Sequence, residues 1–322
     1  AHNEYLSFGS KNIERRDYQI LGYAFSEFTI KGGTIPALIG SIGNRAFGSC
    51  ESLTAIRIPD GKKTLKINTG YYGTFAYSGA EKTVYAGRNI ERNANEATFS
   101  NVTGVEFGPS MTNIATYLLA GSTALANVKA RWQQPFGIDD NVFADVVYQT
   151  ATLWIPNGTL QAYKAANGWK NFIKVDYAYF NVSLQANKGG TVTAGELKAG
   201  NSTVGTLFDC GSNVQVVITE YEGYELKSLT VNGTAVQPAN GVYTIQNLQA
   251  DQTVVATFGP IEYTISYDLA GGSLPQGKTN PATYNVETAT FTLVSPERQC
   301  YEFTGWTCTG LNEPAKTVCQ SY

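Results

Sequence analysis

Few side chains in this sequence combine the types and the spacing that catalysis or metal binding requires. Asp139-Asp140 is the closest carboxylate pair and could supply the acid and base of a glycosidase. Such carboxylates need a defined separation across a cleft, whereas adjacent residues point apart, so we interpret the pair as a solvated turn. Glu220, Glu222 and Glu225 could bind calcium, but they lack the closely spaced oxygen ligands of a calcium loop. We expect no metal, no cofactor and no catalytic residue.

Histidine and cysteine add little to this inventory. The single histidine is His2, so the chain has almost no side chain that could perform imidazole catalysis or bind zinc through histidine. The five cysteines form an odd set without a short paired spacing: Cys50, Cys210, Cys300, Cys308 and Cys319. Three of them crowd near the C-terminal end, where a local disulfide and buried thiols both remain open. The sequence therefore predicts a protein that is not an enzyme.

Charge and length exclude further classes of function. The 322 residues hold 23 basic and 26 acidic side chains, a net charge of −3, without the basic stripe that nucleic acid binding requires. No apolar run approaches the roughly 18 residues of a membrane span. At roughly 150 residues per domain, the chain is long enough for about two domains.

Internal repetition is the strongest pattern in the sequence. The unit 42–59 recurs without a gap at 114–131, and looser copies lie between and after them. Each copy carries one large apolar anchor, and the anchors are 20 to 28 residues apart: Phe47, Phe75, Phe99, Leu119 and Phe143. That spacing is typical of a leucine-rich solenoid, in which stacked repeats bury one continuous core.

The end of the array has the pattern of a capping segment, at 157–174. Thr159 is placed to cap the N-terminus of a short helix, and Gly168 can close its C-terminus. Trp169 and Phe172 follow at once and would cover the last repeat. We assign residues 1–176 to the solenoid.

Beyond residue 177 the apolar period changes to the alternation of β-strands. One small β module occupies 177–259 and a second occupies 260–322, because 223–233 aligns without gaps onto 300–310. We expect Phe303 and Trp306 in the core of the second module. The first module ends in an apolar strand pattern at 251–258, and the second stops at Tyr322 without a counterpart, so we expect it to be truncated with an open sheet edge.

Two segments of the sequence resemble known families. The unit 42–59 resembles the BspA-like leucine-rich repeats of bacterial surface proteins. The segment 263–306, with Gly271-Gly272 and Gly305-Trp306, is similar to the internalin-type B repeat, and 179–258 resembles a divergent form of it. The resemblance implies a mainly β fold: an irregular leucine-rich repeat solenoid with short strands and a C-terminal capping helix, then two small β-grasp-like modules.

The strand pattern also selects a candidate binding surface. If Ile56 and Ile58 face the core, the residue between them faces outward, and stacked repeats place its equivalents in one ladder. The ladder consists of Arg57, Tyr85, Glu106, Lys129 and Trp154. Such a mixture of aromatic and charged side chains suits recognition, although ordinary surface residues remain the alternative.

The function implied by these resemblances is adhesion or protein recognition, outside the cell or at its surface, with any signal segment lying outside this sequence. The partner would be a host matrix or cell-surface protein, or another bacterial surface component, and the β modules would act as a spacer. Two alternatives stay open: a carbohydrate-binding surface protein, favoured by the tyrosine and tryptophan content, and a structural array of the envelope.

Overall fold

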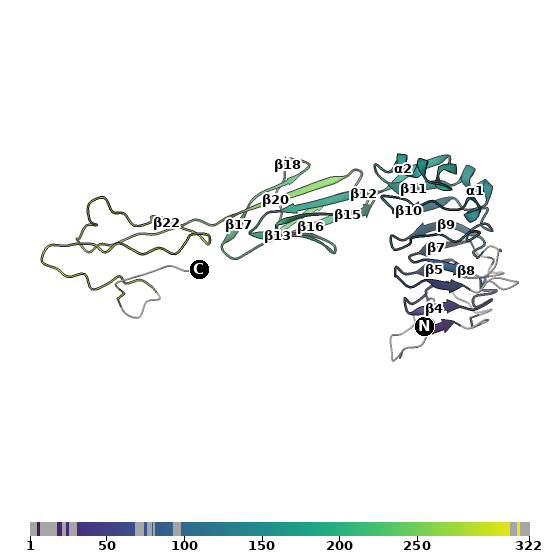
Figure 1. Cartoon of the computed structure of the whole chain (residues 1–322), viewed down its shortest axis with the longest axis horizontal. Helices are drawn as coiled ribbons and strands as arrows, with labels where there is room; N and C mark the ends of the chain where they lie inside the picture. The colour runs from purple at the N-terminus through teal and green to yellow at the C-terminus, as the bar shows by residue number, and fades with distance from the viewer. Residues whose placement is uncertain are drawn as a thin grey trace. The chain divides into compact units, whose positions relative to one another are not determined.

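The computed structural model describes residues 5–6, 18–20, 24–25, 31–67, 74–75, 79, 81–92, 98–309 and 314–315 (Figure 1). Its elements are mainly β-strands, as predicted. The helical elements of the described residues are short: η1 (Asp140–Val142), α1 (Asp145–Thr150), α2 (Leu160–Ala165) and η2 (Trp169–Asn171). The chain divides into two compact units. The first unit comprises Ala1–Asn181, Leu207–Ser212 and Asn247–Asp251, and the second comprises Val182–Thr206, Asn213–Gln246 and Gln252–Tyr322.

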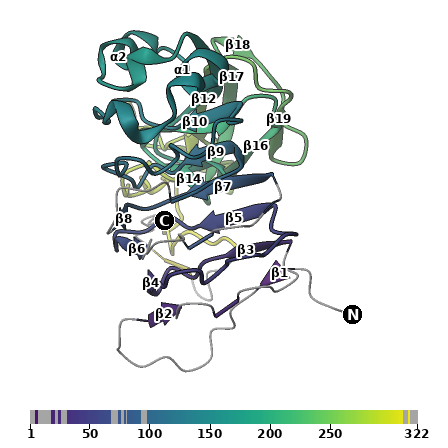
Figure 2. The same ribbon diagram turned by 90° about the vertical axis from the view of Figure 1, so that its right-hand side faces the viewer.

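Parallel strands build the first unit as two sheets, which Figure 2 shows as two columns. In spatial order, the first sheet contains β1 (Tyr5–Leu6), β3 (Gly32–Thr34), β5 (Ala55–Ile58), β7 (Lys82–Ala86), β9 (Val102–Phe107), β10 (Asn127–Ala130), β11 (Thr152–Pro156) and the beginning of β12 (Lys174–Ala186). The second sheet contains β2 (Tyr18–Ile20), β4 (Ile39–Ile42), β6 (Leu65–Ile67) and β8 (Ile90–Arg92). The sequence pattern predicted strands of the first sheet and missed the second sheet.

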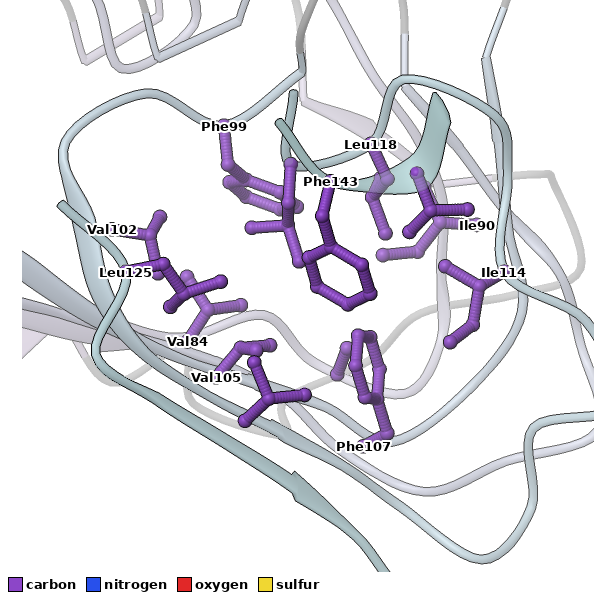
Figure 3. Packing of buried hydrophobic residues seen from close by; sticks show 14 of the residues in the cluster. Val84, Ile90, Phe99, Val102, Val105, Phe107, Ile114, Leu118, Leu125 and Phe143 are labelled. Carbon is purple, nitrogen blue, oxygen red and sulfur yellow. The ribbon is translucent and has the colours of Figure 1, made fainter. Parts of the chain in front are cut away.

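Buried and exposed side chains alternate along the strands, and the buried ones form the core of the repeats. In β5 the side chains of Ile56 and Ile58 are buried, while Arg57 between them is exposed. The same alternation recurs in β7 and β9, so Val105 and Phe107 point into the interior that Figure 3 shows. Successive parallel strands therefore present one apolar face and one outward face.

Three of the predicted anchors form a column of aromatic rings. Phe47 stacks on Phe75 with ring centroids 5.4 Å apart, and Phe75 stacks on Phe99 at 5.0 Å. Leu119 and Phe143 are also buried and are joined by a parallel β-bridge. Each ring thus removes apolar surface of its neighbours from water, which one repeat alone could not do.

The segment after β11 differs in detail from the prediction. Thr159 does not cap α2 with its side chain. Its backbone lies at φ −99° and ψ 0°, away from the extended conformation of most caps, and its hydroxyl donates to the Pro156 carbonyl at 2.7 Å instead. The helix ends at Ala165, before Gly168. Gly168 is nevertheless required, because its φ is +74° and a Cβ there would lie 2.7 Å from the Ile138 carbonyl oxygen.

Two glycines at strand ends allow the turns of successive repeats to approach closely. Gly87 follows β7, and a Cβ on it would lie 2.6 Å from the Pro59 carbonyl carbon and 2.7 Å from the Ile58 oxygen. Gly108 follows β9, and a Cβ on it would lie 2.7 Å from the Cα of Gly87. Both obstructions are backbone atoms, which cannot move aside as a side chain could.

The second unit contains two differently built sheets. One contains β12 from Val182 onward, β20 (Gln252–Pro260), β17 (Tyr224–Val231) and β18 (Thr234–Ala235), and β15 (Ser202–Asp209) also pairs with β12. The other is antiparallel, in the order β14 (Leu197–Ala199), β13 (Gly190–Ala194), β16 (Val214–Glu220) and β19 (Val242–Ile245). Asn232-Gly233 and Asn240-Gly241 both have positive φ, the conformation that tight hairpin turns demand.

The residues after 260 form less regular structure than the sequence alignment predicted. Their described strands are β21 (Tyr263–Thr264) and β22 (Thr283–Tyr284), and the segment aligned with β17 has a single described bridge, from Trp306 to Ala315. Phe303 and Trp306 contact each other but are half-buried, because little sheet covers them. Cys210, Cys300 and Cys308 are exposed thiols, and Cys319 lies outside the described residues, as does most of the predicted open edge.

We expect Phe99→Ala to lower the free energy of unfolding by about 3–5 kcal/mol, because it opens a cavity in the ring column. Leu38→Ala is the matched control, since the Leu38 side chain is 58 % exposed, and it should change stability by less than about 0.5 kcal/mol. Urea unfolding measures both. Equal losses for the two variants would show that the column does not stabilise the unit.

Gly87→Ala should cost about 1–3 kcal/mol of stability, because the added methyl group meets backbone. Gly104→Ala in β9 is the control: its Cβ would meet only the Thr83 Cγ2, at 3.5 Å, an ordinary contact. We expect it to leave stability unchanged or raise it by up to about 1 kcal/mol. Thermal unfolding of the two variants in parallel decides the point, and a Gly87→Ala protein as stable as the wild type would contradict the close approach.

Candidate binding face

The five residues of the predicted ladder lie side by side on successive strands. Arg57 pairs in register with Tyr85, and Tyr85 with Glu106. Glu106 pairs with Lys129, and Lys129 with Trp154. Neighbouring strands lie about 4.8 Å apart, so the five side chains form a continuous row, which we call the ladder row.

The row continues at both ends beyond the predicted residues. Thr34 pairs with Arg57 on one side, and Asp176 pairs with Trp154 on the other. Both occupy the same outward strand position, but β3 and β12 lie outside the part of the sequence where the repeat pattern is clear. Only the strand register identifies them.

A second outward row lies beside the ladder row and has one position without a side chain. It runs from Thr83 through Gly104 to Asn127, which pair with one another in register. The bare backbone of Gly104 forms the floor of a hollow of about 570 Å³, which we call the central hollow. Its walls include Tyr85, Glu106, Lys129, Trp154, Tyr177 and Asp209.

One wall of the hollow is fixed by Tyr85. Its hydroxyl donates to Asp60 Oδ2 at 2.5 Å, and the Arg57 guanidinium lies over its ring, 4.0 Å from the centroid. Burial and the hydrogen bond to Asp60 raise the pKa of the Tyr85 phenol, so it remains neutral at physiological pH. The ring is thus held at a defined position.

Arg131 forms ion pairs with two carboxylates, Glu106 in the ladder row and Asp209 beside it. Its Nε donates to Glu106 Oε1 at 2.7 Å and its Nη2 donates to Asp209 Oδ1 at 2.8 Å, while its guanidinium lies 4.3 Å from the Tyr179 ring centroid. Burial alone would lower the pKa of Arg131, but Tyr179, Glu106 and Asp209 outweigh it and raise that pKa. Sequence patterns did not predict these ion pairs, because Asp209 is separated from Arg131 by 78 positions in the sequence.

The opposite wall is held by Trp154. Its indole Nε1 donates to Asn127 Oδ1 at 2.9 Å, which fixes the ring, and within the described part of the chain the Asn127 amide hydrogens have no acceptor. Lys129 lies between Trp154 and Glu106 in the row and makes no ion pair or side-chain hydrogen bond with the described residues. Donors are therefore available in the hollow.

Several of the carboxylates considered for catalysis or for calcium binding serve local structure. Asp139 Oδ1 accepts a hydrogen bond from the Asn141 backbone at 2.9 Å, and Asp140 Oδ1 accepts from Asn171 Nδ2 at 2.8 Å. Glu220 Oε1 accepts from the backbone of Leu226 at 2.8 Å. Among the described residues, histidine, cysteine and acidic side chains form no group of three that could hold a metal ion.

No helix in the described part of the chain has the length and apolar character needed to cross a membrane.

Comparison with known proteins identifies the repeats. No curated protein matches the sequence. Residues 18–149 match the family model of the BspA type Leucine rich repeat region in six copies, and this part of the chain is therefore a leucine-rich repeat region.

Proposed function

We propose that this chain is a non-enzymatic bacterial protein, secreted or held at the cell surface, that recognises another protein through the ladder row. The observation that carries the proposal is the register that aligns Arg57, Tyr85, Glu106, Lys129 and Trp154 on five successive strands. The match of residues 18–149 to BspA type repeats supports a role in protein interaction.

The composition of the ladder row suits recognition. Interfaces are enriched in aromatic residues and arginine, and their binding energy concentrates in a few such side chains. Tyr85 and Trp154 are held by hydrogen bonds to Asp60 and Asn127, so little side-chain entropy is lost when a partner binds. The row is thus a preorganised surface.

In the proposed architecture, the remaining parts of the chain support the ladder row. Residues 1–176 form a solenoid closed by the segment 157–174, in which the buried Trp169 and Phe172 pack on Phe143. The modules at 177–259 and 260–322 are B-repeat-like spacers that carry the solenoid away from the cell. The proposed partner is a host matrix or cell-surface protein, or another bacterial surface component. Adhesion is the proposed outcome.

Replacing Arg57, Tyr85 and Trp154 together with threonine should weaken binding to the surface or partner protein that the wild type binds by at least about tenfold. The reason is that buried aromatic and arginine contacts each contribute on the order of 2 kcal/mol. Binding to immobilised host matrix proteins and to bacterial envelope extracts, measured over a concentration series, gives the comparison.

Lys66→Thr/Glu91→Thr is the matched control. These residues pair in register on β6 and β8 of the second sheet, and both side chains are well exposed. The control should bind as the wild type does, and urea unfolding should show both variants folded. Unchanged binding by a folded ladder variant would contradict the proposal and favour a purely structural array.

A further inference from the structure

The two carboxylates that line the central hollow, Glu106 and Asp209, are balanced by two cations. Glu106 and Asp209 share the guanidinium of Arg131, and Lys129 adds a second positive charge beside them. Two carboxylates thus meet two cations. An anionic ligand would approach Glu106 and Asp209, and a cationic one would approach Lys129 and Arg131. A neutral ligand is favoured, because a charged one would lose hydration without a net opposite charge to replace it.

The polar atoms left over in the hollow are both donors and acceptors. The Asn127 amide and the Lys129 ammonium can donate, since the described residues leave both unengaged. Glu106 Oε2 and Asp209 Oδ2 can accept, because Arg131 uses the other oxygen of each. Hydroxyl groups match such a mixture, because each hydroxyl donates one hydrogen bond and accepts others.

Aromatic rings complete the lining. Trp154, Tyr85 and Tyr177 flank the Gly104 floor, and the first two are fixed by the hydrogen bonds described above. The electron-rich faces of such rings pack against C–H groups that carry partial positive charge. A ligand with an apolar ring face and hydroxyls at its rim fits both features.

The position of the hollow disfavours an added peptide strand. Gly104 lies in β9, which is paired on both sides, with β7 and with β10, so its backbone groups are already used in the sheet. A strand-adding peptide needs a free sheet edge. The volume of about 570 Å³ lies in the range of small-molecule sites.

We propose that the central hollow binds a neutral saccharide. A sugar ring packs on Trp154 above Gly104, and its hydroxyls bond to Asn127, Lys129 and Glu106. This inference rests on the proposed function, in that both place recognition on the same face. The inference specifies the chemistry of the ligand at the centre of that face, which is a glycan on the surface of the partner.

Gly104→Val tests the saccharide site, because it fills the floor and its Cβ meets only Thr83 Cγ2 at 3.5 Å. The control Ala55→Val adds a similar side chain in the same outward row, on β5, where it pairs with Thr83 but lies outside the lining of the hollow. The full chain is titrated with neutral trisaccharides of glucose, mannose and N-acetylglucosamine, and with trigalacturonate as the charged probe. Tryptophan fluorescence reports on the half-buried Trp154 and Trp306, since Trp132 and Trp169 are buried, and loss of the change in Gly104→Val assigns it to the central hollow.

At least one neutral trisaccharide should change the fluorescence saturably, with binding weakened about tenfold or more by Gly104→Val and unaffected by Ala55→Val. The inference is overturned if no neutral sugar binds, if only trigalacturonate binds, or if Gly104→Val binds as tightly as the wild type. In those cases the proposed function still stands when the ladder variant loses its protein partner. A ladder variant that keeps its partner overturns the proposed function instead.

Discussion

The parallel pairing of successive strands at matched positions is the constraint on which the first unit depends. Because side chains alternate along a strand, a slip of one residue between β7 and β9 would turn Val105 and Phe107 outward and Glu106 inward. Burial of Val105 and Phe107 therefore selects the register. The same register aligns Tyr85, Glu106 and Lys129 on the outer face, so the core and the binding surface have one cause.

Close packing and open space are both produced by glycines in this array. Gly87 and Gly108 are needed because backbone atoms of neighbouring turns leave no room for a Cβ. Gly104 has room, and its missing side chain opens the hollow between Tyr85 and Trp154. Glycine residues thus stabilise the close packing of the turns and, in our proposal, make room for a ligand on the sheet.

Much of the first unit follows from local patterns, and the rest depends on distant contacts. The anchors and the outward positions were predictable because they repeat with a fixed spacing and a period of two. The second sheet was not, since strands of only three residues such as β6 and β8 carry little periodicity. The Arg131–Asp209 pair joins residues far apart in sequence, and the hollow exists only once the register places Gly104 beside Thr83 and Asn127. After residue 260, sequence similarity to β17 overestimated the amount of strand.

Hydroxyl-radical footprinting of the chain, alone and bound to its captured partner surface, tests most directly whether recognition occurs on the ladder row. Radicals oxidise solvent-accessible aromatic side chains, so the half-buried Tyr85, Trp154 and Tyr177 report on that face, and the exposed Tyr221 and Tyr301 report on the second unit. The account predicts that the partner protects Tyr85, Trp154 and Tyr177 and leaves Tyr221 and Tyr301 unprotected. Protection confined to Tyr221 or Tyr301, with the ladder row unchanged, would contradict it.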